Sequence, residues 1–104
     1  MLAPIITNNI TQIEAICREH KVKELYVFGS AAKNEMKEGS DVDFIVKFNP
    51  DVAIEDYADL YFDFVEELEG LLKLHVDLLT DKPIRNIYLK RSIEETKQII
   101  YNAA

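Results

Sequence analysis

Two carboxylates placed two residues apart form the most chemically informative feature of this sequence. Asp41 and Asp43 stand at the head of the apolar, β-branched segment 44–46. Side chains alternate between the two faces of a β-strand, so both carboxylates should project from one face, roughly 6.6 Å apart at ~3.3 Å per residue. Such a pair repels itself unless a cation lies between its members. The spacing predicts half of a metal site, although isolated Asp-x-Asp motifs also occur on ordinary solvated strands.

A small-residue turn, Gly29-Ser30, ends ten residues before Asp41. It closes a predicted strand at 24–28 and leads into a predicted short helix at 31–36, so backbone N–H groups and the helix dipole can face an anion there. The Ser30 hydroxyl adds a donor at the same place. Gly-Ser turns are common without any ligand, but next to paired acids this turn is a candidate phosphate-binding site.

Strands and helices alternate along the chain. Residues 7–21 are expected to form an amphipathic helix, with either Thr7 as N-cap or Thr11 and Glu14 as a capping box. Further strands are expected at 42–48 and 74–79, a long helix at 54–72, and a helical segment at 84–101. We expect Pro83 in the first turn of that last segment and a break near Lys90. This order predicts an α/β (α+β) fold with a small parallel or mixed sheet and flanking helices.

Composition narrows the class of protein. The 104 residues contain no linker-like segment and are 48% hydrophobic, which predicts a single domain over residues 1–104. No apolar run approaches the ~20 residues of a membrane span, and no secretory signal is recognisable, so with Cys17 as the one cysteine we expect a cytoplasmic protein. A net charge of −7 argues against direct nucleic-acid binding and is compatible with a basic protein partner or a divalent metal.

The motifs together resemble a known family. Gly29-Ser30, ten intervening residues, Asp41-Val42-Asp43, and a third acid on a later strand, Asp77, are similar to the pattern of the polymerase-beta-like nucleotidyltransferases. The likeness is greatest to their minimal, MNT-type members, which act as antitoxins beside HEPN toxins. It runs from the first helix to segment 84–101 and is most specific over 27–46. It implies the polymerase-beta-like nucleotidyltransferase fold.

The resemblance also implies roles for particular residues. Gly29 and Ser30 match the turn that holds the nucleotide phosphates, Asp41 and Asp43 match the acids that bind two Mg²⁺ ions, and Asp77 matches the third acid of that site, which helps to activate the attacking hydroxyl. Mg²⁺ prefers hard oxygen ligands, and two such ions can clamp the attacking and leaving oxygens of a displacement at phosphorus. Many relatives carry an arginine directly after Gly-Ser, where this chain has Ala31.

Two functions of different classes follow. The first, implied by the resemblance, is an Mg²⁺-dependent enzyme that transfers AMP from ATP to a hydroxyl, that of a tyrosine, on a HEPN-type toxin and so acts as an antitoxin. The second is a catalytically weak antitoxin that neutralises its toxin by forming a hetero-oligomer. Ala31 and the eight acids of segment 51–72, which has no Lys or Arg, motivate the second hypothesis. Modification of an antibiotic is a weaker third possibility, because the chain has no room for a domain that holds such an acceptor.

A few other residues have two readings each. His75 lies two residues before Asp77 and could reach the site, or could be an ordinary hydrogen-bonded histidine. Arg85, Lys90 and Arg91 could contact a triphosphate or a partner, or could simply be solvated. Cys17 lies on the apolar stripe of the first helix, which favours a packing role.

Overall fold

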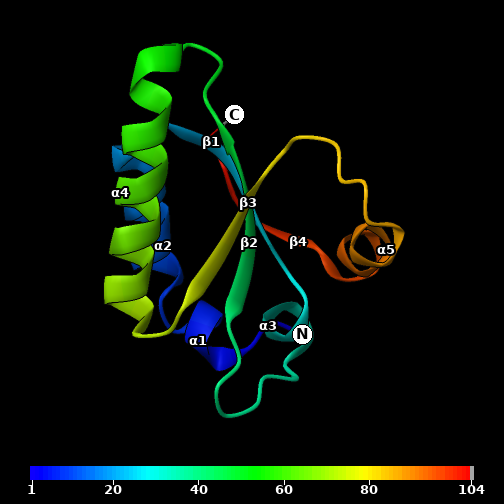
Figure 1. Ribbon diagram of the computed structural model, residues 1–104. Helices are drawn as coiled ribbons and strands as arrows, with labels where there is room; N and C mark the ends of the chain where they lie inside the picture. The colour runs from blue at the N-terminus through cyan, green and yellow to red at the C-terminus, as the bar shows by residue number, and fades with distance from the viewer. Residues whose placement is uncertain (104) are drawn as a thin grey trace.

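A four-stranded mixed β-sheet organises the computed structural model, which describes residues 1–103 (Figure 1). Its strands are β1 (Val22–Phe28), β2 (Val42–Phe48), β3 (Val76–Thr80) and β4 (Gln98–Asn102), in the spatial order β3-β2-β1-β4. Strand β1 is antiparallel to both β2 and β4, whereas β2 and β3 are parallel. The expected small mixed sheet with flanking helices is confirmed.

Helices α2 (Ile10–Glu19) and α4 (Ile54–Leu72) cover one face of this sheet (Figure 1). Strand β2 shows why: Phe44 and Val46 are fully buried against the helices, while Asp43 and Ile45 point to the other face and are half-buried. Period-two alternation thus separates a core face from an open face. The largest fully buried side chains come from α1, α2, α4 and the strands: Phe44, Phe64, Ile6, Ile13, Leu25 and Leu68.

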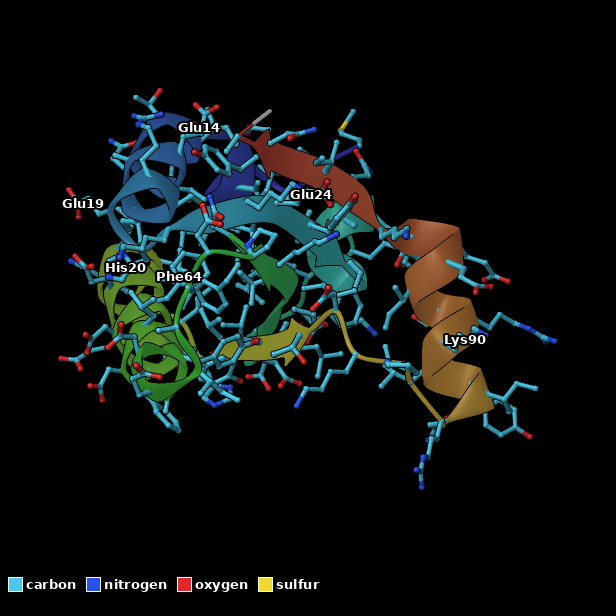
Figure 2. All side chains as sticks on the ribbon, turned by 90° about the horizontal axis from the view of Figure 1, so that it is seen from above. Glu14, Glu19, His20, Glu24, Phe64 and Lys90 are labelled. Atoms are coloured by element: carbon cyan, nitrogen blue, oxygen red, sulfur yellow. The ribbon has the colours of Figure 1, made fainter. Side chains whose placement is uncertain are left out.

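A histidine joins the two covering helices. His20, at the C-terminal end of α2, lies beside Phe64 of α4, with ring centroids 5.8 Å apart (Figure 2). Its Nε2 is 2.6 Å from Glu67 Oε2 on α4, and its Nδ1 is 2.7 Å from the Ile16 carbonyl oxygen on α2. His20 therefore holds the end of α2 and fastens it to α4 from a nearly buried position.

The N-terminal helix is divided in two, which corrects the single helix expected over 7–21. Helix α1 (Pro4–Thr7) precedes α2, so Thr7 ends one helix instead of capping another. Thr11 lies inside α2, and no side chain caps its N-terminus at Asn9. The break falls at two consecutive asparagines, a residue type that competes with helical hydrogen bonds, and the Asn9 side chain donates to the Ile5 carbonyl oxygen.

The C-terminal segment was wrongly predicted to be helical over 84–101. Helix α5 spans only Ile87–Thr96, and the chain then turns at Lys97 into β4. Pro83 lies in the preceding loop, Asn86 caps the helix, and Lys90 sits inside it without a break. Ile100 is buried while its neighbour Ile99 is 48% exposed, so this segment has the alternation of a strand that completes the edge beside β1.

Two shorter elements differ in their bounds. Helix α3 (Ser30–Lys33) begins at the Gly-Ser turn and ends earlier than expected, because Asn34 adopts a left-handed conformation with φ of 59°. Strand β3 begins at Val76, two residues later than expected. Across residues 1–103, no helix combines the length and apolar character that a membrane crossing requires.

Candidate active site

The three predicted carboxylates meet at one end of the open face. Asp43 of β2 and Asp77 of β3 are partners in the parallel register, and Asp41 immediately precedes β2. Registered residues on parallel neighbours point to the same face of a sheet, with strands ~4.8 Å apart. The structure thus brings together two acids that are 34 positions apart in the sequence (77 minus 43).

The electrostatic state of Asp43 reflects this crowding. Partial burial first, and then the negative charges of Asp77 and Asp41, raise the pKa of the Asp43 carboxyl from 3.8 to about 6. Asp41 and Asp77 themselves are exposed. Carboxylate oxygens are the donors that a hard divalent cation prefers, and such a cation would relieve the repulsion of Asp43 by Asp77 and Asp41. The donor set therefore fits Mg²⁺.

Gly29 packs directly against this acid cluster. Its φ of 71° lies in the region that favours glycine, and a Cβ placed on it would lie 2.7 Å from Asp43 Oδ2. Gly29 follows Phe28, the register partner of Asp43 on β1. The turn predicted to bind phosphate is therefore adjacent to the carboxylates, and a side chain at position 29 would separate the two.

The donors of this turn are not equivalent. The Gly29 N–H donates to Thr96 Oγ1 at 2.9 Å, so a protein group already satisfies it. Ser30 is half-buried and begins α3, with its hydroxyl as the turn's side-chain donor. The absence of a side chain at Gly29 thus lets the backbone lie close to Asp43, whereas Ser30 offers a hydroxyl.

His75 touches the cluster through Asp41. Its Nδ1 is 3.4 Å from Asp41 Oδ2, and its backbone carbonyl oxygen accepts from the Val42 N–H. With a side chain that is 67% exposed, it is a surface partner of Asp41 instead of a buried structural histidine. Of the two readings of His75, contact with the carboxylates is the one the geometry supports.

A cavity of about 320 Å³ continues along the open face away from the acids, between the sheet and α5. Ile45, the next residue after Asp43 on that face of β2, lines its floor, and Lys90 belongs to its α5 wall (Figure 2). Arg85 and Arg91 are exposed and do not line it. The remaining lining residues mix charges of both signs: Glu24, Tyr26, Lys47, Thr80, Asp81, Lys82, Ile84, Ile93, Glu94 and Lys97.

Sequence reasoning missed the contributions of Thr96 and Lys97. Lys97 Nζ lies 5.2 Å from the centroid of the Tyr26 ring on β1, which holds this cation over the open face. Neither residue belongs to a motif, and both were expected inside the helical segment 84–101. No local sequence signal identifies them, because residues 98–102, Gln-Ile-Ile-Tyr-Asn, do not alternate polar and apolar residues and are compatible with a helix or a strand.

A second group of potential ligands lies elsewhere. Glu19, His20 and Glu67 have ligand atoms within 4.8 Å of one another, on the helices that cover the opposite face of the sheet. The contacts of His20 with Glu67 and with the Ile16 carbonyl oxygen account for its ring nitrogens. This group is separate from the carboxylates of the open face.

Comparison with known proteins identifies the family of this chain. A nucleotidyltransferase domain model matches residues 10–100. The chain belongs to the nucleotidyltransferase domain family. A Methanocaldococcus jannaschii relative, provisionally named a protein adenylyltransferase, is 40% identical over 83% of this chain and 92% of its own length. The protein adenylyltransferase MntA of Thermococcus cleftensis is 34% identical over 83% and 91% of the two chains.

Solved structures share the fold of this nucleotidyltransferase. A provisionally assigned minimal nucleotidyltransferase has a TM-score of 0.68 at 26% identity, covering 94% of this chain and 95% of its own. A chain from a complex of a tri-AMPylated Shewanella oneidensis HEPN toxin with an MNT antitoxin has a TM-score of 0.62 at 17% identity, covering 93% and 72%. The predicted fold, the likeness to MNT-type proteins, and a nucleotidyltransferase related to protein adenylyltransferases are all confirmed.

Proposed function

We propose that this nucleotidyltransferase transfers AMP from ATP to a tyrosine hydroxyl of a HEPN-type toxin and thereby acts as its antitoxin. The observation that carries the proposal is the parallel register of Asp43 and Asp77, together with the close approach of Asp43 to the Gly29-Ser30 turn. The names of the curated relatives support protein adenylylation, and the complex of an AMPylated HEPN toxin with an MNT antitoxin supports the class of partner. Residues 1–104 would act as one minimal domain.

Each site residue has a chemical task in this proposal. Asp41, Asp43 and Asp77 would hold two Mg²⁺ ions, which supply positive charge to the triphosphate when bound. Ser30 would donate to a phosphate oxygen. The acceptor oxygen attacks the α-phosphorus of ATP, pyrophosphate leaves, and the hydroxyl proton passes to the Asp77 carboxylate. Asp77 is suited to this because it is exposed and lies at the edge of the cluster.

The open-face cavity is the place where the rest of the nucleotide would bind. It begins at Ile45, two residues after Asp43 on the same face of β2. Its lining includes Tyr26 and the cations Lys47, Lys90 and Lys97. An aromatic ring and several ammonium groups beside a carboxylate cluster fit a base and a polyphosphate better than they fit an apolar ligand.

The test uses the full chain, Mg-ATP and a HEPN-type toxin, with intact-mass measurement of that toxin. We expect the wild type to add AMP, and Asp41→Asn and Asp77→Asn to lose at least about 10²-fold in rate, the usual scale for removing one group that acts in the transition state. Asp51→Asn is the matched control, because Asp51 is exposed in the turn that follows β2 and lies outside the cavity. Addition of AMP at equal rates by all four proteins would contradict the proposal.

A second candidate is neutralisation of the toxin by complex formation alone. It is favoured by the outer face of α4, where acids surround Phe62, whose side chain is 67% exposed. An exposed aromatic ring within an acidic surface suits a basic partner. In that case Asp43→Asn would still co-purify with the toxin and still protect cells. Retained binding with loss of protection would leave AMP transfer as the function.

A further inference from the structure

Thr96, the last residue of α5, makes hydrogen bonds in two directions. Its Oγ1 donates to the Ser92 carbonyl oxygen at 2.6 Å and accepts from the Gly29 N–H at 2.9 Å. The first bond ties the side chain to its own helix, and the second reaches a residue 67 positions away. The hydroxyl is half-buried between them. Thr96 therefore connects the end of α5 to the turn that carries Ser30.

The segment that follows Thr96 holds the other side of the same turn. Gln98 Nε2 donates to the Ala32 carbonyl oxygen at 2.8 Å, across 66 positions of sequence. From the N-terminus, the Ala3 N–H donates to the Ala31 carbonyl oxygen, also at 2.8 Å. The turn and the first residues of α3 are thus held by the junction of α5 and β4 and by the start of the chain, in addition to their own strand.

Small displacements of this turn matter because of its closeness to Asp43. A Cβ on Gly29 would lie only 2.7 Å from Asp43 Oδ2, so the backbone at position 29 is in near contact with the carboxylate. A shift of the turn by a fraction of an ångström alters the spacing between Ser30 and the acids. Sites that bind and react with a phosphate are sensitive to misplacements of this size.

Helix α5 has little else to hold it to the sheet. It stands away from the body of the molecule (Figures 1 and 2), with Ile93 as its buried residue and Ile87 and Tyr88 strongly exposed. It also carries Lys90 and Glu94, which line the open-face cavity, and Lys97 follows it. The Thr96 bond to Gly29 therefore sets the cavity wall relative to the turn.

We infer that Thr96 is a positioning residue of the nucleotide site: its hydroxyl fixes the Gly29-Ser30 turn relative to both the Asp43 carboxylate and the α5 wall of the cavity. The inference rests on the proposed function for its effect on the nucleotide, but the hydrogen bond itself is independent of any activity. Loss of the hydroxyl should leave the acids in place and loosen the turn and the wall together.

Three variants separate these effects. Thr96→Val keeps the shape and removes both hydrogen bonds, and Thr96→Ser keeps the hydroxyl. Thr7→Val is the matched control, because the Thr7 hydroxyl also donates to a carbonyl oxygen of its own helix, that of Pro4, but accepts no bond from the Gly29 turn. Circular dichroism and thermal melting establish that each variant is folded, and Thr96→Ala serves as a second test if the valine variant is not.

The measurements are amide exchange at Gly29 by NMR and titration of the full chain with Mg-ATP. In Thr96→Val we expect exchange at Gly29 to accelerate and the Kd for Mg-ATP to rise roughly five- to tenfold, the scale of losing one or two hydrogen bonds. For Thr96→Ser and Thr7→Val, the Kd for Mg-ATP should stay within about twofold of the wild-type value. With an acceptor protein, KM for ATP should rise more than kcat falls.

The outcomes are distinguishable. Unchanged Gly29 exchange in Thr96→Val, or faster exchange with an unchanged Kd, would overturn the positioning role. If Thr7→Val weakens Mg-ATP binding as much as Thr96→Val does, the cause is a general loss of helix stability. That result would also overturn the positioning role of Thr96. Failure of the wild type to bind Mg-ATP would overturn the proposed function, and with it the nucleotide role of Thr96, whereas the exchange data would still decide whether the tether exists.

Discussion

Asp43 and Asp77 face each other across adjacent parallel strands, and this register converts a local Asp-x-Asp motif into a cluster of three carboxylates. Neither strand alone provides the arrangement, because β2 contributes one side of it and β3 the other. Burial is the main reason that the pKa of Asp43 is raised, and the charges of Asp77 and then Asp41 raise it further.

The acid cluster predicts that the free energy of unfolding depends on pH. Because the pKa of Asp43 is raised from 3.8 to about 6 in the folded protein, stability should fall as pH rises through this range. Asp43→Asn removes this loss of stability, so without divalent cations it should be more stable than the wild type by about 1 kcal/mol at pH 7.5. The whole pKa shift corresponds to about 3 kcal/mol, but solvent screens this partly exposed group and reduces the effect. Urea denaturation at pH 4 and 7.5 measures the difference. An equal gain at both pH values would contradict the electrostatic cause.

Gly29→Ala should destabilise the protein more than Gly39→Ala. Both glycines have positive φ, 71° and 84°, so each alanine incurs backbone strain of about 1–2 kcal/mol. Only at Gly29 does the new methyl meet Asp43 Oδ2, whereas nothing lies within 4 Å at Gly39. We expect the Gly29 variant to lose at least about 1 kcal/mol more, on the scale of overpacking. Equal losses of stability by the two variants in denaturant titrations would contradict this prediction, because they would show that the turn accommodates the methyl group without a loss of stability.

The contact of His20 with Glu67 predicts a large effect at a site distant from the carboxylates. His20→Ala removes a nearly buried ring with its contacts to Ile16 and Glu67 and its packing on Phe64, so we expect a loss of roughly 2–4 kcal/mol. His75→Ala is the comparison, because that histidine pairs with Asp41 from an exposed position and should cost under about 0.5 kcal/mol. Chemical denaturation measures both, and similar losses would refute the difference in burial as the cause.

Cys17 should be unreactive in the native state. Burial raises the pKa of its thiol to about 12, with a further contribution from Glu14, and the side chain has no exposed surface. Thiolate is the reactive form, so labelling by a disulfide reagent at pH 8 should be slower than in urea-unfolded protein by on the order of 10³ or more. Labelling kinetics with and without urea check this, and similar rates would mean that α2 opens readily.

Local pattern predicted much of the fold and most of the candidate site. The alternation of residues 42–48 predicted β2 with its bounds, and the apolar stripe of residues 54–72 predicted α4. Segment 98–102 was misread because a short run with two isoleucines is compatible with a helix or a strand. Pairing with the open edge of β1 decided between them. The break in the first helix was missed because hydrophobic spacing continues across Asn8 and Asn9.

The sequence by itself determined that Asp41 and Asp43 share a face and that a glycine turn precedes them, since covalent geometry and the period of a strand fix neighbours along a chain. The resemblance to a family named Asp77 as the third acid, but the tertiary structure decided which residues lie next to the motif: Asp77 by the parallel register with β2, and Thr96 by the docking of the α5 end on Gly29. Strand pairing and burial choose such partners across tens of residues, and no local spacing encodes that choice.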